Sequence, residues 1–263
     1  MKISIYQVDA FSSKVFGGNP AAVCVLDEWL PDTLMQQIGA ENNLSETAFL
    51  VKEGKDYHIR WFTPTAEVDL CGHATLASAH VLFQHLGFPG DKLTFHSKSG
   101  VLKVTSHKGK RLTLDFPATP PGQVLEPAPG AIADGLHIQN PVVHKGPFDF
   151  MVVLPTQQEV EALQPDFKTL AQAGGRGVVV TAKGDEADFI SRCFYPQTGI
   201  DEDPVTGSAH TMMVPYWAEK LGKKKLTAIQ LSTRKGYLDC ELKKNRVLMS
   251  GYAVTYLKGE IKV

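Results

Sequence analysis

The chain has 263 residues, 43% of them hydrophobic and 21% charged, which suits a globular protein with one large core or two ordinary ones. Its 27 basic and 28 acidic residues leave a formal net charge of −1, so no long-range field gathers nucleic acid or an anionic membrane. No run of about 18 apolar residues is present, which predicts no membrane span. A small neutral or weakly anionic ligand fits this balance better.

The first residues, MKISIYQVDAF, alternate like a strand and contain no apolar signal segment, so we expect a cytoplasmic protein. Further along, AAVCVLDEWLPDTLMQQIGAENNLSETAFLV (residues 21–51) predicts a strand, a helix and a second strand. The four cysteines are scattered and form no CxxC pair. In a long intracellular chain such cysteines are expected to be reduced and buried.

The segment DLCGHATLASAH (residues 69–80) holds a cysteine, two histidines and an aspartate. From Gly72 onward, apolar residues cover most faces of a helix, which predicts a buried helix that stops at Gly87 before Pro89. The spacing of Cys71, His73 and His80 matches no HExxH, CxxC or His-carboxylate pattern. The segment therefore predicts a helix start and argues against a metal site.

The chain contains an internal repeat. Residues 62–87 and residues 194–222 both begin Phe-x-Pro, and each carries a glycine-to-glycine step of the same length, Gly72 to Gly87 and Gly207 to Gly222. We interpret the repeat as a duplication in which each half is a strand, a helix, a strand pair, a long helix and a closing hairpin. Pro215 lies inside the second long helix and is expected to kink it or end it early.

Between the halves, DFPATPPGQVLEPAPGAIADG (residues 115–135) is rich in proline and glycine, which predicts a linker, with a long surface loop as the alternative. We expect an α+β protein of two domains, residues 1–117 and 118–263, with the terminal strand able to return to the first. Each long helix begins at a glycine, and a helix N-terminus offers unpaired N–H groups to a carboxylate or phosphate.

Four ordered segments, VDAFSSKVFGGNPAAVCVL, NNLSETAFL, RWFTPTAEVDLCGHATLASA and GIDEDPVTGSAH, give the chain a resemblance to the PhzF-like (phenazine biosynthesis isomerase-like) family, which is related in fold to diaminopimelate epimerase. The resemblance spans essentially the whole chain. It implies two pseudo-symmetric domains, each a mostly antiparallel sheet barrel around a central helix, with the ligand between them. It also implies a homodimeric enzyme without cofactor or metal that moves a proton within a small carboxylic acid.

By position, the resemblance assigns the catalytic carboxylate to Glu46 and further site residues to His73, Asp203 and Ser208, with backbone N–H groups from Gly72 and Gly207. Glu46 directly precedes the apolar stretch TAFLV, so its side chain can lie at the edge of the core and act as base and then as acid. The alternative for Glu46 is a solvated turn residue. For Asp203 it is a turn acid ahead of Pro204.

The two halves differ where the related epimerases place paired thiols. Cys71 occupies one such position, but Thr206 stands at the other, and the segment equivalent to Glu46 is GGRGVVV, without a carboxylate. One-sided chemistry follows, in which Glu46 moves a proton between two carbons on the same face of a conjugated acid. Cys71 is then a buried packing residue, since no partner base has a suitable spacing.

Three functions remain open. The first is this isomerase, the second is an amino-acid racemase or epimerase, and the third is a carboxylate-binding protein without turnover. The sequence does not identify the substrate.

Overall fold

The computed structural model describes residues 1–263 and divides the chain into two compact units. The first unit comprises Met1–Asp115 and Ser250–Val263, and the second comprises Phe116–Met249. The chain thus leaves the first unit two residues before the expected boundary at residue 117 and returns to it with its last strand. Both units combine helices with a mixed sheet, so the expected α+β class is confirmed. None of the helices is long and apolar enough to cross a membrane.

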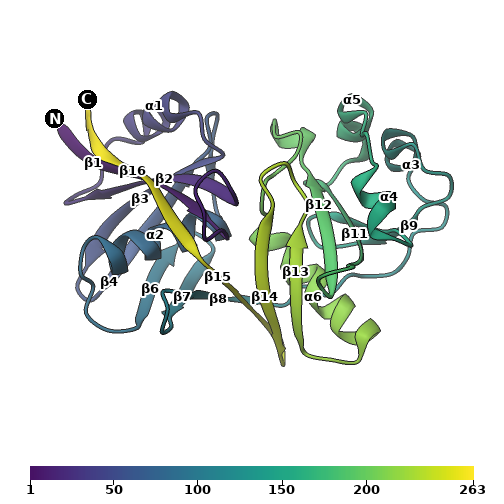
Figure 1. Ribbon diagram of the computed structural model, residues 1–263. Coiled ribbons are helices and arrows are strands. Elements are labelled where there is room, and N and C mark those ends of the chain that lie inside the picture. Colours follow the sequence, from purple (N-terminus) through teal and green to yellow (C-terminus); the bar gives the residue numbers. More distant parts are fainter. The chain divides into compact units, whose positions relative to one another are not determined.

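The first unit has one sheet in the order β16-β1-β2-β3-β4-β6-β7-β8, with β5 beside β4 (Figure 1). Most neighbours are antiparallel, but β2 and β3 are parallel and so are β4 and β6. Its elements are β1 (Lys2–Ala10), β2 (Asn19–Leu26), α1 (Asp32–Asn42), β3 (Glu46–Glu53), β4 (Asp56–Phe62), β5 (Glu67–Val68), α2 (Gly72–Gln84), β6 (Lys92–Ser97), β7 (Gly100–Ser106), β8 (Leu112–Pro117, partly in the second unit) and β16 (Ala253–Lys262).

Helix α2 forms the centre of the first unit. Every residue from Gly72 to Leu82 is buried, and the helix packs against β1, β2 and β3. The buried helix that the sequence predicts from Gly72 is thus confirmed. It ends at Gln84, and Gly87 lies just beyond in a left-handed conformation. Because most of α2 is buried among the strands, its N-terminal end is the part from which Cys71 and His73 can form a site.

The second unit has the sheet order β15-β14-β13-β12-β11-β10-β9, in which β12 and β13, and β10 and β11, are parallel. Its elements are α3 (Gly130–Leu136), β9 (Val142–Lys145), β10 (Phe150–Val153), α4 (Gln157–Glu161), α5 (Phe167–Leu170), η1 (Ala171–Ala173), β11 (Val178–Lys183), β12 (Phe189–Phe194), η2 (Pro196–Thr198), α6 (Gly207–Leu221), β13 (Lys225–Gln230), β14 (Gly236–Lys243) and β15 (Arg246–Gly251, partly in the first unit).

Helix α6 continues past the proline that was expected to kink it or end it early. It continues from Gly207 to Leu221 with Pro215 inside, so the expectation of an early end is wrong. Proline lacks the N–H that would bond the carbonyl four residues earlier, that of Thr211. The Thr211 carbonyl instead accepts a hydrogen bond from the backbone N–H of Thr119 at 3.0 Å, which offsets the lost helical bond.

Only residues 118–129 of the expected linker (residues 115–135) connect two regular elements. β8 extends to Pro117, and α3 already begins at Gly130 after Pro129. Between them, the backbone N–H of Gly122 donates to the Lys145 carbonyl at 2.8 Å. Composition alone misjudged this segment, because the Ala-Ile-Ala stretch behind Pro129 favours a helix and buries Ile132 in the core of the second unit.

Candidate active site

Glu46 is placed by the start of β3. This strand follows α1 after a short turn in which Asn43 is left-handed, and at this end β3 pairs in parallel with β2, Glu46 opposite Ala21. The next residue, Thr47, points into the core and is fully buried. Strand alternation turns Glu46 to the other face, where its side chain is 13% exposed. The carboxylate therefore lies at the edge of the core and not in bulk water.

Cys71 and His73 flank the first residue of α2. Cys71 is the N-cap residue in an extended conformation and makes no side-chain capping bond, and His73 is the second helical residue. Both side chains are buried. Because no side chain caps this helix, its first N–H groups stay available to a ligand at the same point where Cys71 and His73 emerge.

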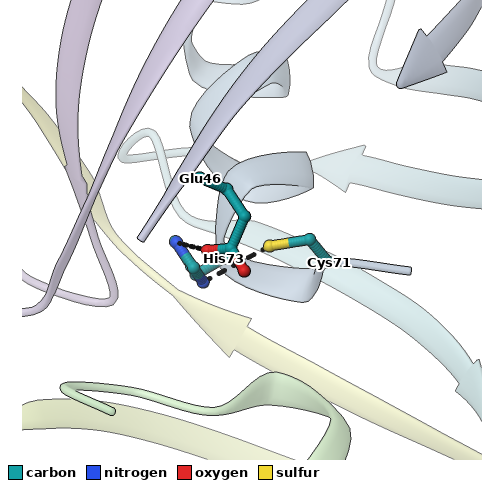
Figure 2. A group of neighbouring side chains, drawn as sticks. All are labelled: Glu46, Cys71 and His73. Carbon is teal, nitrogen blue, oxygen red and sulfur yellow. Dashed lines mark hydrogen bonds and ion pairs between the residues drawn. The ribbon is translucent and has the colours of Figure 1, made fainter. Parts of the chain in front are cut away.

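Glu46, Cys71 and His73 meet around one imidazole ring (Figure 2). The Oε2 atom of Glu46 lies 3.1 Å from Nε2 of His73, and Sγ of Cys71 lies 3.5 Å from Nδ1. The ring thus has the carboxylate at one nitrogen and the thiol at the other. Although Oε2 and Nε2 are close, they are not aligned for a hydrogen bond, and both atoms are buried without a hydrogen-bond partner.

Asn19 holds the same ring from β2. Its Nδ2 lies 3.2 Å from Nδ1 of His73, and the residue is fully buried. Gly18 makes this position possible, because it has a φ of +63° and a Cβ there would come within 2.0 Å of the Ala10 carbonyl oxygen. This contact ties the imidazole to β2, and which of the two atoms donates depends on the protonation of the ring.

Burial and neighbouring charge act in opposite directions on this group. Burial alone would lower the pKa of His73, but the acidic groups of Cys71 and Glu46 raise it well above its ordinary value. Burial raises the pKa of the Cys71 thiol to about 11, with a further contribution from Glu46. At neutral pH Cys71 is therefore a thiol.

The three side chains could also supply metal ligands, since one donor atom from each lies within 4.8 Å of the others. The sequence pattern missed this group because Glu46 is distant in the chain. In the observed arrangement, however, the thiol and the carboxylate contact opposite nitrogens of His73. A single metal ion bound to one nitrogen of His73 could not also bind both the Cys71 thiol and the Glu46 carboxylate unless the side chains rearranged. The geometry therefore fits proton transfer better than metal coordination.

In the second unit, the expected site residue Asp203 belongs to a buried turn before α6. Its carboxylate accepts a hydrogen bond from the Thr206 hydroxyl. Gln230, which is fully buried, accepts from the Thr206 backbone N–H at 2.8 Å and donates to the Asp203 carbonyl at 2.7 Å. These bonds fix the turn that leads into Gly207. Asp203 thus helps to fix this turn, and the sequence did not indicate Gln230.

Ser208, the second residue of α6, contacts Arg176. In the repeat, Arg176 stands in the segment GGRGVVV, which is equivalent to the segment of Glu46. Arg176 donates from Nη2 to the Ser208 hydroxyl at 3.0 Å, and Nε and Nη2 bind the two carboxylate oxygens of Asp149. The guanidinium also lies over the rings of Phe148 and Tyr195. The Asp149 carboxylate is buried, whereas the Arg176 side chain is 34% exposed, so this is a half-buried, bidentate ion pair at a helix start.

The structure therefore forms two groups from the expected site residues. Glu46, Gly72 and His73 meet in the first unit, together with Cys71 and Asn19. Asp203, Gly207 and Ser208 gather at the start of α6 in the second unit, together with Arg176. The sequence predicted no partner base for Cys71, but the imidazole of His73 lies beside its thiol. The only available signal was that the two residues flank one helix start, where side chains two apart can converge.

The chain is similar to known proteins over its whole length. Residues 8–259 match the family described as phenazine biosynthesis-like protein. An uncharacterised isomerase of Pseudomonas aeruginosa is 52% identical over 264 residues, with 100% of both chains covered. The crystal structure of a phenazine biosynthesis protein of the PhzF family from Enterococcus faecalis superposes with a TM-score of 0.95 at 47% identity, covering 100% of both chains.

A more distant similarity concerns the fold alone. A hydroxyproline epimerase from Agrobacterium vitis, with trans-4-OH-L-proline bound, superposes with a TM-score of 0.64 at 10% identity. The alignment covers 99% of this chain and 92% of the epimerase. The fold is thus shared with this epimerase, and the residues must decide the chemistry.

Proposed function

The chain belongs to the phenazine biosynthesis-like protein family, and from this premise we propose that it is a cofactor-independent isomerase that moves a proton within a small carboxylic acid through Glu46. The family relatives named isomerases support the reaction class. The epimerase neighbours support a substrate that carries a carboxylate.

One observation carries the proposal. Oε2 of Glu46 is buried, and the contact that holds it is the ion pair with Nε2 of His73 at 3.1 Å. A carboxylate that is shielded from bulk water and held against an imidazole is placed to take up a proton from a bound substrate, and an acidic C–H group is a proton donor of that kind.

The chemistry follows from the neighbours of Glu46. The carboxylate takes a proton from a carbon of a conjugated acid, and the electron pair of that C–H bond shifts the double bond by one position. The protonated Glu46 then returns the same proton to the far carbon on the same face. Nε2–H of His73, at 3.1 Å, balances the charge on Glu46 before and after the transfer. No oxidant or second base is needed.

The remaining expected residues are proposed to bind the substrate. Support comes from the start of α2, where Gly72 opens a helix without a side-chain cap, and from α6, where Gly207 and Ser208 do the same beside Arg176. Both ends suit a carboxylate. Asp203 is proposed to act through the turn that it stabilises with Thr206.

The test compares two variants of neighbouring residues. Wild-type protein is screened in D₂O against small unsaturated and amino carboxylic acids, with ¹H NMR as the readout for proton exchange. Glu46→Gln should lower exchange about 10²- to 10⁴-fold, the usual contribution of general acid–base catalysis. It should leave substrate binding within about tenfold, because the amide keeps the size of the side chain. Cys71→Ala should retain most of the activity.

A thiol-based epimerase is the second candidate, because Sγ of Cys71 lies 3.5 Å from Nδ1 of His73. It requires a thiolate, which the burial of Cys71 opposes. An inactive Cys71→Ala together with near-normal exchange by Glu46→Gln would establish this candidate in place of the isomerase. Tight carboxylate binding without any exchange by the wild type would instead identify a binding protein.

A further inference from the structure

Two histidines face each other on the outer side of the sheet in the first unit. His58 of β4 and His96 of β6 are directly paired across these two parallel strands (Figure 1). The preceding residues of the two strands, Tyr57 and Phe95, are buried, whereas both histidines are partly exposed. Because alternate residues of a strand point to opposite faces, the two imidazoles lie together on the face opposite to these aromatic rings.

A carboxylate lies beside each imidazole. Nε2 of His58 is 2.9 Å from Oε2 of Glu53, and Nε2 of His96 is 3.2 Å from Oδ2 of Asp56. Glu53 and Asp56 close the hairpin between β3 and β4, where Gly54 turns the chain with a φ of +60°. The hairpin therefore sets the two acidic residues directly opposite each other. We define Glu53, Asp56, His58 and His96 as the outer His–carboxylate group.

The charges of this group conflict in the absence of a cation. Like charges in directly facing strand positions are destabilising. When both imidazoles are neutral, Glu53 and Asp56 oppose each other as two anions. When both are protonated, His58 and His96 oppose each other as two cations. A bound divalent ion removes both conflicts, because it balances the carboxylates and binds neutral imidazoles.

The spacings in the group match those of ligands around one tetrahedral ion. With bonds of about 2.0–2.1 Å to the ion, two ligand atoms lie about 3.3 Å apart and two imidazole centroids about 5.2 Å apart. The rings of His58 and His96 have centroids 5.4 Å apart, with planes inclined by 45°. Their side chains are 45% and 38% exposed, so small rotations can direct one nitrogen of each ring toward a shared ion.

We propose that the outer His–carboxylate group binds Zn²⁺ or a similar transition-metal ion. His58 and His96 each supply one imidazole nitrogen, and Glu53 and Asp56 supply carboxylate oxygens. Imidazole ligands suit such ions, whereas Mg²⁺ and Ca²⁺ prefer oxygen ligands alone. Four protein ligands leave no open position on a tetrahedral ion, so the site is structural and ties the β3–β4 hairpin to β6.

The opposing explanation is a set of two separate ion pairs at the surface. Exposed ion pairs of this kind contribute little to stability. They also give no reason for two imidazoles at the spacing of metal ligands. Motif searching does not reveal the group, because His58 and His96 are far apart in the chain and meet only through the pairing of β4 with β6.

A second set of donor atoms, from Glu46, Cys71 and His73, has to be separated from this site in a metal measurement. Glu46 and Glu53 are the first and last residues of β3, and strand alternation directs them to opposite faces. The metal site is thus independent of the chemistry proposed for Glu46, and failure of one proposal leaves the other standing. Cys71→Ala removes the thiol from the second set and leaves the outer group unchanged.

The first measurement titrates tag-free Cys71→Ala protein with Zn²⁺ against a chromophoric chelator, at about pH 7.5 because protons compete for the ligands. We expect one ion per chain and no competition from excess Mg²⁺. His58→Gln and His96→Gln should each weaken binding about tenfold or more, since even partners outside the ligand set change metal affinity by about 10- to 100-fold. His107→Gln, which removes an exposed histidine of the same unit, is the matched control and should bind like the parent.

The second measurement replaces Zn²⁺ by Co²⁺, whose visible absorption is strong in a tetrahedral site and weak in an octahedral one. The bands should develop on titration, shift in Glu53→Gln or Asp56→Asn, and disappear in each histidine variant. All four altered side chains are at least partly exposed, so these variants should fold. No Zn²⁺ binding by the Cys71→Ala protein, or binding that both histidine variants retain, would overturn the proposal.

Discussion

The starts of α2 and α6 resemble each other in sequence, with Cys-Gly-His at residues 71–73 and Thr-Gly-Ser at residues 206–208, but they carry different chemistry. At α2, an acid, an imidazole and a thiol converge around His73. At α6, the hydroxyl of Ser208 accepts from Arg176, whose charge is balanced by Asp149. One helix start can exchange protons, and the other presents a fixed cation and hydroxyl groups.

The difference teaches that a helix N-terminus determines where an anionic ligand can bind, whereas the side chains around it determine which reaction is possible. Both ends offer N–H groups and a positive dipole. Glu46 adds a proton acceptor to the first, whereas Arg176, whose guanidinium stays protonated at any working pH, cannot transfer protons at the second. The first unit is thus the proposed centre of chemistry, and the second unit is proposed to contribute binding.

The largest expected effect concerns the thiol at α2. If Cys71 is a thiol with a pKa of about 11, its alkylation by iodoacetamide should accelerate about tenfold per pH unit, roughly 10³-fold between about pH 7 and pH 10, because only the thiolate reacts. Mass spectrometry of the Cys71 peptide measures the rate. Cys193 in the second unit, whose pKa burial also raises, is the matched control. Rapid, pH-independent labelling of Cys71 would break the comparison in favour of thiol chemistry.

The next effect concerns the cation at α6. Arg176→Met should destabilise the protein by about 3 kcal/mol, because it leaves the carboxylate of Asp149 buried without its partner. Urea unfolding gives the free energy. Adding Asp149→Asn should recover most of the loss, since the remaining side chain is then neutral. If Arg176→Met is neutral, the ion pair does not organise this helix start.

The smallest effect compares two histidines near the helix starts. Burial lowers the pKa of His210 to about 4 from 6.5, so the unfolded chain binds the proton more readily and stability falls as pH drops through this window. The free energy of unfolding of His210→Gln, minus that of the wild type, should therefore be about 2 kcal/mol larger at about pH 5 than at about pH 7.

His73 should show the opposite sign. Its pKa is raised in the folded protein, so its contribution to stability is present below the unfolded value and is lost as pH rises through the folded one. His73→Gln should thus cost more stability at about pH 6 than at about pH 9. Chemical unfolding at both pH values checks this. The same sign for both histidines would show that the two helix starts do not differ electrostatically.

Local pattern was sufficient for several features. The apolar run behind Gly72 predicted α2, since a helix that is apolar on nearly all faces must be buried. Four ordered segments indicated the family, and Glu46 before an apolar strand indicated a carboxylate at the edge of the core. The expectation that Pro215 ends the helix early was wrong, because the donor that replaces the lost helical bond comes from Thr119, far away in the chain.

What the sequence determined by itself was thus the mixed fold class, the two buried helices and the candidate acid, because periodicity and composition act within a few turns of chain. Only the tertiary structure brought Glu46 and Asn19 to the ring of His73, and Arg176 to Ser208. Such contacts depend on strand register and side-chain direction between distant segments, and a pattern of neighbouring residues does not record either.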